Sequence, residues 1–130
     1  MLPSVMIVED DPAIREVYVI KFEIEGYPVV GAENGKQALD LLEQFNPDII
    51  LLDMMMPVMG GLEFMRHFRG RNHGADVIVF SNMSAPDQIK AALSLGACDY
   101  WIKSDYTPEL IVKRVRERWG SRKQPDPKKT

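Results

Sequence analysis

The sequence has 130 residues, of which 45% are hydrophobic and 27% charged, the length and composition of one globular domain. No apolar run approaches the roughly 18 residues that a membrane span needs, and the N-terminus lacks a secretory signal, so no membrane contact is expected. The net charge is −3, and the single cysteine, Cys98, allows neither an internal disulfide nor a zinc site, which favours a cytoplasmic protein.

Charge is unevenly distributed along the chain. Residues 113–130 carry eight Lys or Arg against two acidic residues. Basic residues are favourable in the last turns of a helix, and "SRKQPDPKKT" is typical of a solvated basic tail or linker over residues 121–130. Because no aromatic residue beyond Trp119 is interleaved with these charges, direct nucleic-acid binding is disfavoured.

Five short apolar runs alternate with five segments of helical periodicity. The predicted strands are residues 5–8, 27–32, 49–52, 77–80 and 99–102. The predicted helices are residues 12–26, 34–45, 61–68, 84–95 and 107–119. Pro28 indicates an edge position for the second strand, because proline donates no ladder hydrogen bond. Asp11 is a predicted N-cap of the first helix, and Ser84 with Asp87 resembles a capping box for the fourth.

The regular alternation of strand and helix predicts a parallel sheet covered by helices on both faces. No G-x-G-x-x-G motif follows the first strand, which disfavours a dinucleotide-binding fold. We therefore expect an α/β, flavodoxin-like, doubly wound (βα)5 fold with a five-stranded parallel sheet in the order 2-1-3-4-5. In such a fold the ligand site lies at the carboxyl ends of the strands.

Polar residues stand at the carboxyl ends of four of these strands. They are Glu9, Asp10 and Asp11 after the first strand, Asp53 after the third, Ser81 after the fourth and Lys103 after the fifth. Carboxylates gathered at one rim repel one another unless a cation lies among them. Oxygen ligands suit a hard divalent ion, and Mg²⁺ matches best. Asp53 is then a candidate nucleophile that forms an aspartyl phosphate, with Lys103 sharing the phosphoryl charge.

Four motifs in order resemble the receiver domain of two-component response regulators. They are "VEDD" after the first strand, "LLDMMMPVMGG" at the third, Ser81 ending the fourth and "GACDYWIK" at the fifth. The resemblance extends over nearly the whole chain, and the chain is similar to receiver domains of the chemotaxis-regulator type. It implies a receiver domain over residues 1–120 and a basic flexible tail or linker over residues 121–130.

The resemblance assigns a role to each matching residue. Asp53 would accept the phosphoryl group from a histidine kinase or a histidine phosphotransfer protein, and Lys103 would pair with the phosphate. Asp10 and Asp11 would hold Mg²⁺ together with Asp53, and the backbone carbonyl of Met55 would complete the protein ligands. The domain would thus be a signalling phosphoacceptor rather than an enzyme, catalysing only its own phosphorylation and slow dephosphorylation.

The resemblance also implies a switch that controls partner binding. Ser81 would move toward the phosphoryl group, and the ring of Tyr100 would turn inward behind it. The output would be read on the face formed by the fourth helix, the fifth strand and the fifth helix. The sequence does not identify the output partner or fused effector domain. A phosphorylation-dependent homodimer through this face is a further alternative. The chain is either a complete regulator or a domain of a longer protein.

Three positions depart from the family pattern. Ser104 follows Lys103 where the family usually has a proline after a cis bond, so this bond is either cis or trans here. Met55 and Met83 stand two residues after Asp53 and Ser81, where side chains help to position the water that attacks the phosphoaspartate. Methionine cannot orient water by strong hydrogen bonds, which predicts slow self-dephosphorylation.

Two other functions compete with this interpretation. A phosphohydrolase of the haloacid dehalogenase type also uses an aspartate nucleophile, but it places a second acid two residues later, where this chain has Met55. The other alternative is a degenerate receiver that binds a partner without phosphorylation. The acidic residues and Lys103 disfavour it, and Ser104 keeps it open.

Overall fold

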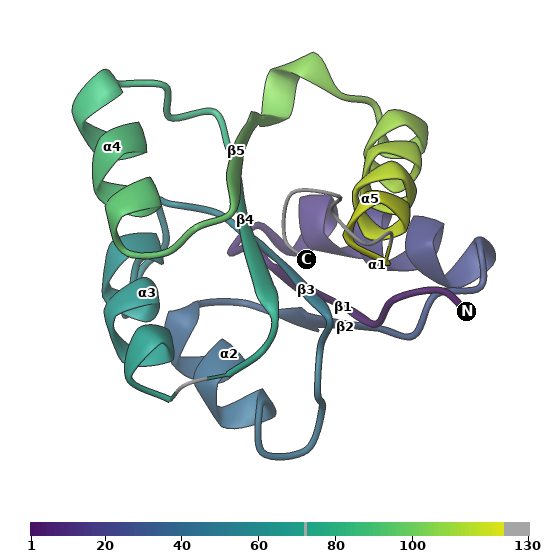
Figure 1. Ribbon diagram of the computed structural model, residues 1–130, viewed down its shortest axis with the longest axis horizontal. Coiled ribbons are helices and arrows are strands. Elements are labelled where there is room, and N and C mark those ends of the chain that lie inside the picture. The colour runs from purple at the N-terminus through teal and green to yellow at the C-terminus, as the bar shows by residue number, and fades with distance from the viewer. Residues whose placement is uncertain (72, 124–130) are drawn as a thin grey trace, which may run out of the picture.

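The computed structural model describes residues 1–71 and 73–123, and these form one α/β unit around a central sheet (Figure 1). The elements are β1 (Val5–Val8), α1 (Pro12–Ile24), β2 (Val29–Ala32), α2 (Gly35–Leu41), β3 (Ile49–Leu52), α3 (Gly61–Gly70), β4 (Asp76–Ser81), α4 (Pro86–Ser94), β5 (Asp99–Ile102), a 3₁₀ turn (Lys103–Asp105) and α5 (Pro108–Lys123). All strand pairs are parallel, in the order β2-β1-β3-β4-β5, as predicted.

The central strands are buried and the edge strands are not, which explains their sequences. All four residues of β1 and all four of β3 are buried, because each strand has a neighbour on both sides and helices on both faces. β2 and β5 form the two edges and are mostly half-buried. Pro28 directly precedes the edge strand β2, so the prediction of an edge position is confirmed.

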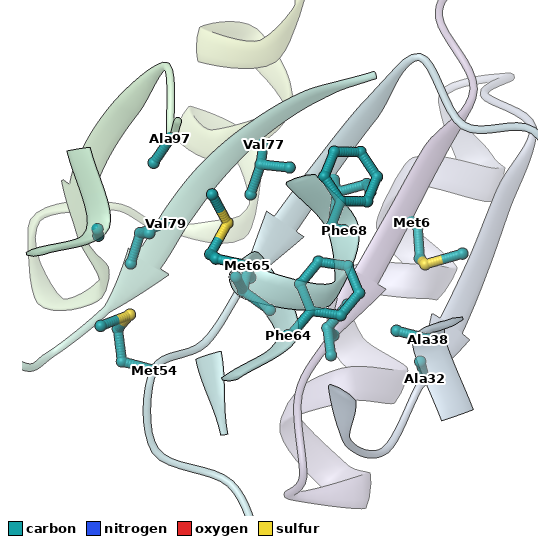
Figure 2. Packing of buried hydrophobic residues seen from close by; sticks show 14 of the residues in the cluster. Met6, Ala32, Ala38, Met54, Phe64, Met65, Phe68, Val77, Val79 and Ala97 are labelled. Carbon is teal, nitrogen blue, oxygen red and sulfur yellow. The ribbon is translucent and has the colours of Figure 1, made fainter. Parts of the chain in front are cut away.

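Alternate residues of each strand point into two hydrophobic clusters, one on each face of the sheet. One cluster lies under α1 and α5 and contains Val5, Ile7 and Phe22. The other lies under α2, α3 and α4 and contains Met6, Val8 and Phe64. Figure 2 shows Phe64 and Phe68 of α3 over the sheet in this second cluster, with their rings stacked 5.6 Å apart. Burying such a ring contributes about 1.5–3 kcal/mol, so the two clusters hold the strand ends in place.

The start of α1 agrees with its capping signal and the start of α4 does not. Asp11 accepts hydrogen bonds from the amides of Ala13 and Ile14, at 2.9 and 3.2 Å, and so caps α1 as predicted. The capping box predicted for α4 does not form. This helix begins at Pro86, after Ala85, and has no side-chain cap bond. Proline is pre-organised for the first helical position, which shifts the start past Ser84.

The last helix is longer than the sequence indicated. α5 continues to Lys123, so residues 121–123 of the predicted tail are helical. The rest of the predicted tail, residues 124–130, lies outside the described residues. Among the helices that the structure describes, none has the length and apolarity needed to span a bilayer.

Candidate functional site

Three carboxylates gather at the carboxyl ends of β1 and β3. Glu9, Asp10 and Asp53 each offer an oxygen atom, and these atoms lie within 4.8 Å of one another. Glu9 is 4% exposed and Asp53 9%, whereas Asp10 faces solvent. This oxygen-only set fits a hard divalent ion such as Mg²⁺, which keeps several waters of its own.

The ammonium group of Lys103 joins two of these carboxylates. Its Nζ contacts Oε1 of Glu9 directly and lies 3.2 Å from Oδ2 of Asp53. Burial alone would lower the pKa of Lys103, but the hydrogen bond to Glu9 and the charge of Asp53 outweigh it and hold this pKa above its usual value. Burial raises the pKa of Glu9, with Lys103 opposing the shift. We call Glu9, Asp10, Asp53 and Lys103 the acidic half of the site.

The loop after β3 holds the Asp53 carboxylate at the rim. The amide of Met54 donates to Oδ1 of Asp53 at 2.7 Å, and the amide of Met55 does so at 3.4 Å. Gly61 allows the loop to fold back closely, because a Cβ there would lie 2.7 Å from the carbonyl oxygen of Asp53. Val58 takes a left-handed backbone conformation with φ of 68°, which is unfavourable for a β-branched residue.

Two hydroxyl groups lie on the other side of the site, one on Ser81 at the end of β4 and one on Tyr100 within β5. Ser81 is 2% exposed, and its Oγ accepts a hydrogen bond from the amide of Met83 at 3.2 Å. The hydroxyl of Tyr100 donates to the carbonyl of Met83 at 2.5 Å. Burial, with the charge of Asp53, raises the pKa of Tyr100. We call Ser81, Met83 and Tyr100 the hydroxyl half of the site.

The structure changes the membership of the acidic cluster. Asp11, a predicted metal ligand, lies outside the group of three, and its Oδ1 caps α1. Glu9 takes its place, and its Oε2 also accepts from the Asp11 amide at 3.2 Å. The sequence held a signal for this outcome: a D-P pair at a helix start commits the aspartate to capping, which leaves Glu9 and Asp10 at the strand end.

The loop after β5 answers the question that Ser104 raised in the sequence. The described residues contain no cis peptide bond, so Lys103 and Ser104 are joined in trans. The amide of Ser104 donates to Oδ1 of Asn82 at 2.8 Å, which ties this loop to the one after β4.

Comparison with known proteins identifies the family. A family model for the response regulator receiver domain matches residues 5–116, and the chain therefore belongs to the receiver domains of response regulators, signalling domains of two-component systems. It is 34% identical over 109 residues to the response regulator MprA of Mycolicibacterium vanbaalenii, covering 84% of this chain and 47% of that protein. It is 42% identical over 104 residues to the transcriptional regulatory protein MalR of Bacillus subtilis, covering 77% and 43%.

Longer alignments and solved structures agree. The DNA-binding response regulator MtrA of Mycolicibacterium smegmatis is 31% identical over 118 residues, with 91% of this chain and 51% of that protein covered. The chain thus spans about half the length of the curated relatives it matches. A CheY-like receiver domain from Methanospirillum hungatei superposes with a TM-score of 0.84 at 25% identity, covering 93% of this chain and 96% of that one. The Francisella response regulator 1452 receiver domain gives 0.81 at 30%, covering 93% and 99%.

Proposed function

We propose that this domain is a phosphorylation-driven switch in which Asp53 accepts a phosphoryl group from a histidine kinase or histidine phosphotransfer protein. The observation that carries the proposal is the placement of Asp53 within 4.8 Å of two other carboxylates and beside Lys103. A purely structural carboxylate would not be held among like charges at the rim of a sheet.

The oxygen atoms of Glu9, Asp10 and Asp53 would hold Mg²⁺, with the Met55 carbonyl as a further ligand. When bound, the ion would neutralise charge that develops on the transferring phosphoryl group. Asp10 is the exposed member of the set, so it lies where an ion arrives from solvent. Asp11 is left out of this ligand set, because its side chain is used by α1.

The transfer itself needs little from the protein beyond position and charge. A carboxylate oxygen of Asp53 attacks the phosphorus of a phosphohistidine, the P–N bond breaks, and the imidazole leaves with the electron pair. The amides of Met54 and Met55 hold Oδ1, while Oδ2 faces Lys103. Lys103 is held protonated by its two carboxylate partners, so it carries the positive charge that the phosphoryl oxygens require.

Ser81 and Tyr100 would convert phosphorylation into a change of surface. Both side chains bind the main chain of one residue, Met83, at the start of the loop between β4 and α4. A Ser81 hydroxyl that turned to a phosphoryl oxygen would release the Met83 amide. Phosphorylation shifts the population only as far as such contacts differ between the two states. The face of α4, β5 and α5 would then bind the output partner or a second copy.

The identity of the output is suggested only by the relatives. MtrA is named as a DNA-binding response regulator and MalR as a transcriptional regulatory protein, and both are about twice as long as this chain. A DNA-binding output in the same pathway is consistent with these names. Contact with DNA would belong to an effector rather than to this domain, and a cytoplasmic location follows from a histidine kinase partner.

The phosphate on Asp53 should be long-lived, because Met55 and Met83 flank the site. Met55 is 65% exposed, yet neither thioether orients an attacking water well. We expect Met55→Asn and Met83→Glu to shorten the phosphoaspartate lifetime, by roughly tenfold or more if water positioning limits the rate. Decay of the phosphorylated mass after removal of the donor measures this lifetime. An unchanged lifetime in both variants would contradict the expectation.

Intact-mass measurement after incubation with acetyl phosphate and Mg²⁺ tests the function directly. We expect one phosphoryl group on the wild type, none on Asp53→Asn, and none on the wild type when Mg²⁺ is chelated. A phosphohydrolase would instead hydrolyse the donor repeatedly and leave no lasting phosphoryl group on the protein. No gain with acetyl phosphate, phosphoramidate or a panel of histidine kinases would overturn the proposal in favour of a phosphorylation-independent binding domain.

A further inference from the structure

Arg15 of α1 reaches back to the end of β1. Its Nη1 donates to the main-chain carbonyl of Glu9 at 2.7 Å. Within the described residues the ion pairs do not include Arg15. The guanidinium thus binds the main-chain carbonyl of Glu9, one of the three residues whose carboxylates form the acidic cluster.

Glu9 directly follows the last residue of β1, where the parallel pairing of β1 with β2 ends. The register of β1 with β2 ends at the pair Val8 and Ala32, and the amide of Glu9 still donates to the Ala32 carbonyl at 2.9 Å. Arg15 supplies a charged donor to the carbonyl of Glu9 just past this last pair. The amide and the carbonyl of Glu9 are thus both hydrogen-bonded, and its carboxylate contacts Lys103.

Gly31 of β2 leaves the space that the Arg15 side chain occupies. A Cβ at Gly31 would lie 3.0 Å from Cδ and 3.1 Å from Cγ of Arg15, and 3.2 Å from Cγ2 of Val19. The positive-φ glycines of the described residues are Gly26 and Gly96. Gly31 therefore gives the Arg15 stem room rather than serving backbone conformation, and a Cβ there would push the stem away by a few tenths of an ångström. The arginine stem crosses the edge strand at the one residue that has no side chain.

We infer that Arg15 is a positioning residue for the acidic half of the site, and that Gly31 is the space that lets it act. By holding the Glu9 carbonyl, Arg15 presets the Glu9 carboxylate beside Asp10 and Asp53. Groups that orient metal ligands typically change metal affinity by about 10–100-fold when they are removed. The inference deepens the proposed function, on which it rests, by naming a residue outside the ligand set that tunes Mg²⁺ affinity.

A double-mutant cycle tests the inference with the Mg²⁺ dissociation constant, measured by calorimetry. We expect Arg15→Ala and Gly31→Ala each to weaken Mg²⁺ binding by about tenfold, and the double variant to be no weaker than either. Non-additivity is expected because both changes act on the same contact, which Arg15→Ala removes and Gly31→Ala shifts. A merely structural role would lower the denaturation midpoint without moving the dissociation constant, so urea unfolding is recorded for each variant.

The Gly31→Ala variant separates the effect of the position of Arg15 from the effect of its charge. Arg15→Ala also deletes a positive charge near the carboxylates, and this by itself would strengthen Mg²⁺ binding. Gly31→Ala keeps that charge and only displaces the side chain. Unchanged binding in Gly31→Ala, or additive losses in the double variant, would overturn the inference. Gly70→Ala is the matched control, because a Cβ there meets nothing within 4 Å, and it should bind Mg²⁺ as the wild type does.

A metal-free measurement distinguishes failure of this inference from failure of the proposed function. The Asp11 amide donates to Oε2 of Glu9, so its hydrogen exchange reports the position of that carboxylate without Mg²⁺. We expect faster exchange at this amide in Arg15→Ala and Gly31→Ala than in the wild type and Gly70→Ala. If the wild type bound no Mg²⁺, the proposed function would fail while this exchange still decided the role of Arg15. Equal exchange in all four proteins would overturn it.

Discussion

The two halves of the site are held by different kinds of interaction. In the acidic half, Glu9 and Asp53 are fixed by the charge of Lys103. In the hydroxyl half, Ser81 and Tyr100 are fixed by neutral hydrogen bonds to Met83. Hydrogen bonds to charged groups contribute about 1.5–3 kcal/mol, and neutral ones about 0.5–1.5 kcal/mol. Under the proposed function, the half that would perform the chemistry is therefore the more strongly held, and the half that would signal can rearrange at lower cost.

Replacement of Lys103 should have the largest effect on stability. Lys103→Met keeps the apolar stem but leaves the buried Glu9 carboxylate beside Asp53 without a cation. Breaking a buried pair typically costs 3–5 kcal/mol, and we expect about 3 kcal/mol here because Lys103 is partly solvated. Urea unfolding near neutral pH measures it. Lys36→Met, at the exposed pair with Asp40, is the control and should cost less than about 0.5 kcal/mol.

The loss in Lys103→Met should depend on pH. Because burial holds the pKa of Glu9 above its usual value, the folded protein takes up this proton before the unfolded chain does. Lowering the pH through the folded-state pKa therefore adds stability relative to neutral pH, and the gain is complete below the unfolded-state value. Without Lys103 this pKa rises further, so the deficit of the variant should shrink in acid. A deficit that is equal at neutral and acid pH would show that Glu9 is not its source.

Sequence patterns predicted the rim but not which carboxylates meet there. Apolar runs that end in Asp53 and Ser81 mark the strand ends directly, and a parallel sheet brings such ends to one edge. The role of Glu9 depends on Lys103, which is 94 residues away. A contact over that distance follows from packing and leaves no local pattern. The same is true of the hydrogen bond from Tyr100 to Met83. The start of α4 lies later than predicted because Pro86 outweighed the capping signal of Ser84.

Relief of backbone strain beside the acidic half should have an intermediate effect, in the stabilising direction. Val58 adopts φ of 68° and is 76% exposed, so it loses little packing when it is shortened. A left-handed conformation costs a non-glycine residue about 1–2 kcal/mol, and part of that gain is offset by the greater freedom of glycine in the unfolded chain. We expect Val58→Gly to raise the unfolding free energy by about 1 kcal/mol. Val58→Ala keeps a Cβ and should gain much less, and equal stability of the two variants would contradict the strain.

Loss of the Tyr100 hydroxyl should have the smallest effect on stability, because neutral hydrogen bonds hold the hydroxyl half of the site. Tyr100→Phe removes the bond to the Met83 carbonyl, and we expect a loss of about 0.5–1 kcal/mol in urea unfolding. Phosphorylation of Asp53 by acetyl phosphate should proceed at the wild-type rate.

Tyr27→Phe is the matched control for this change. The Tyr27 hydroxyl is buried and, within the described residues, has no hydrogen-bond partner. Its removal should therefore be neutral or stabilising, because an unsatisfied buried polar group is unfavourable. A Tyr100→Phe loss as large as that of Lys103→Met would mean that the hydroxyl half is as rigid as the acidic half. In that case phosphorylation could not displace Tyr100 at low cost, and the signal would have to leave the site through another contact of Ser81.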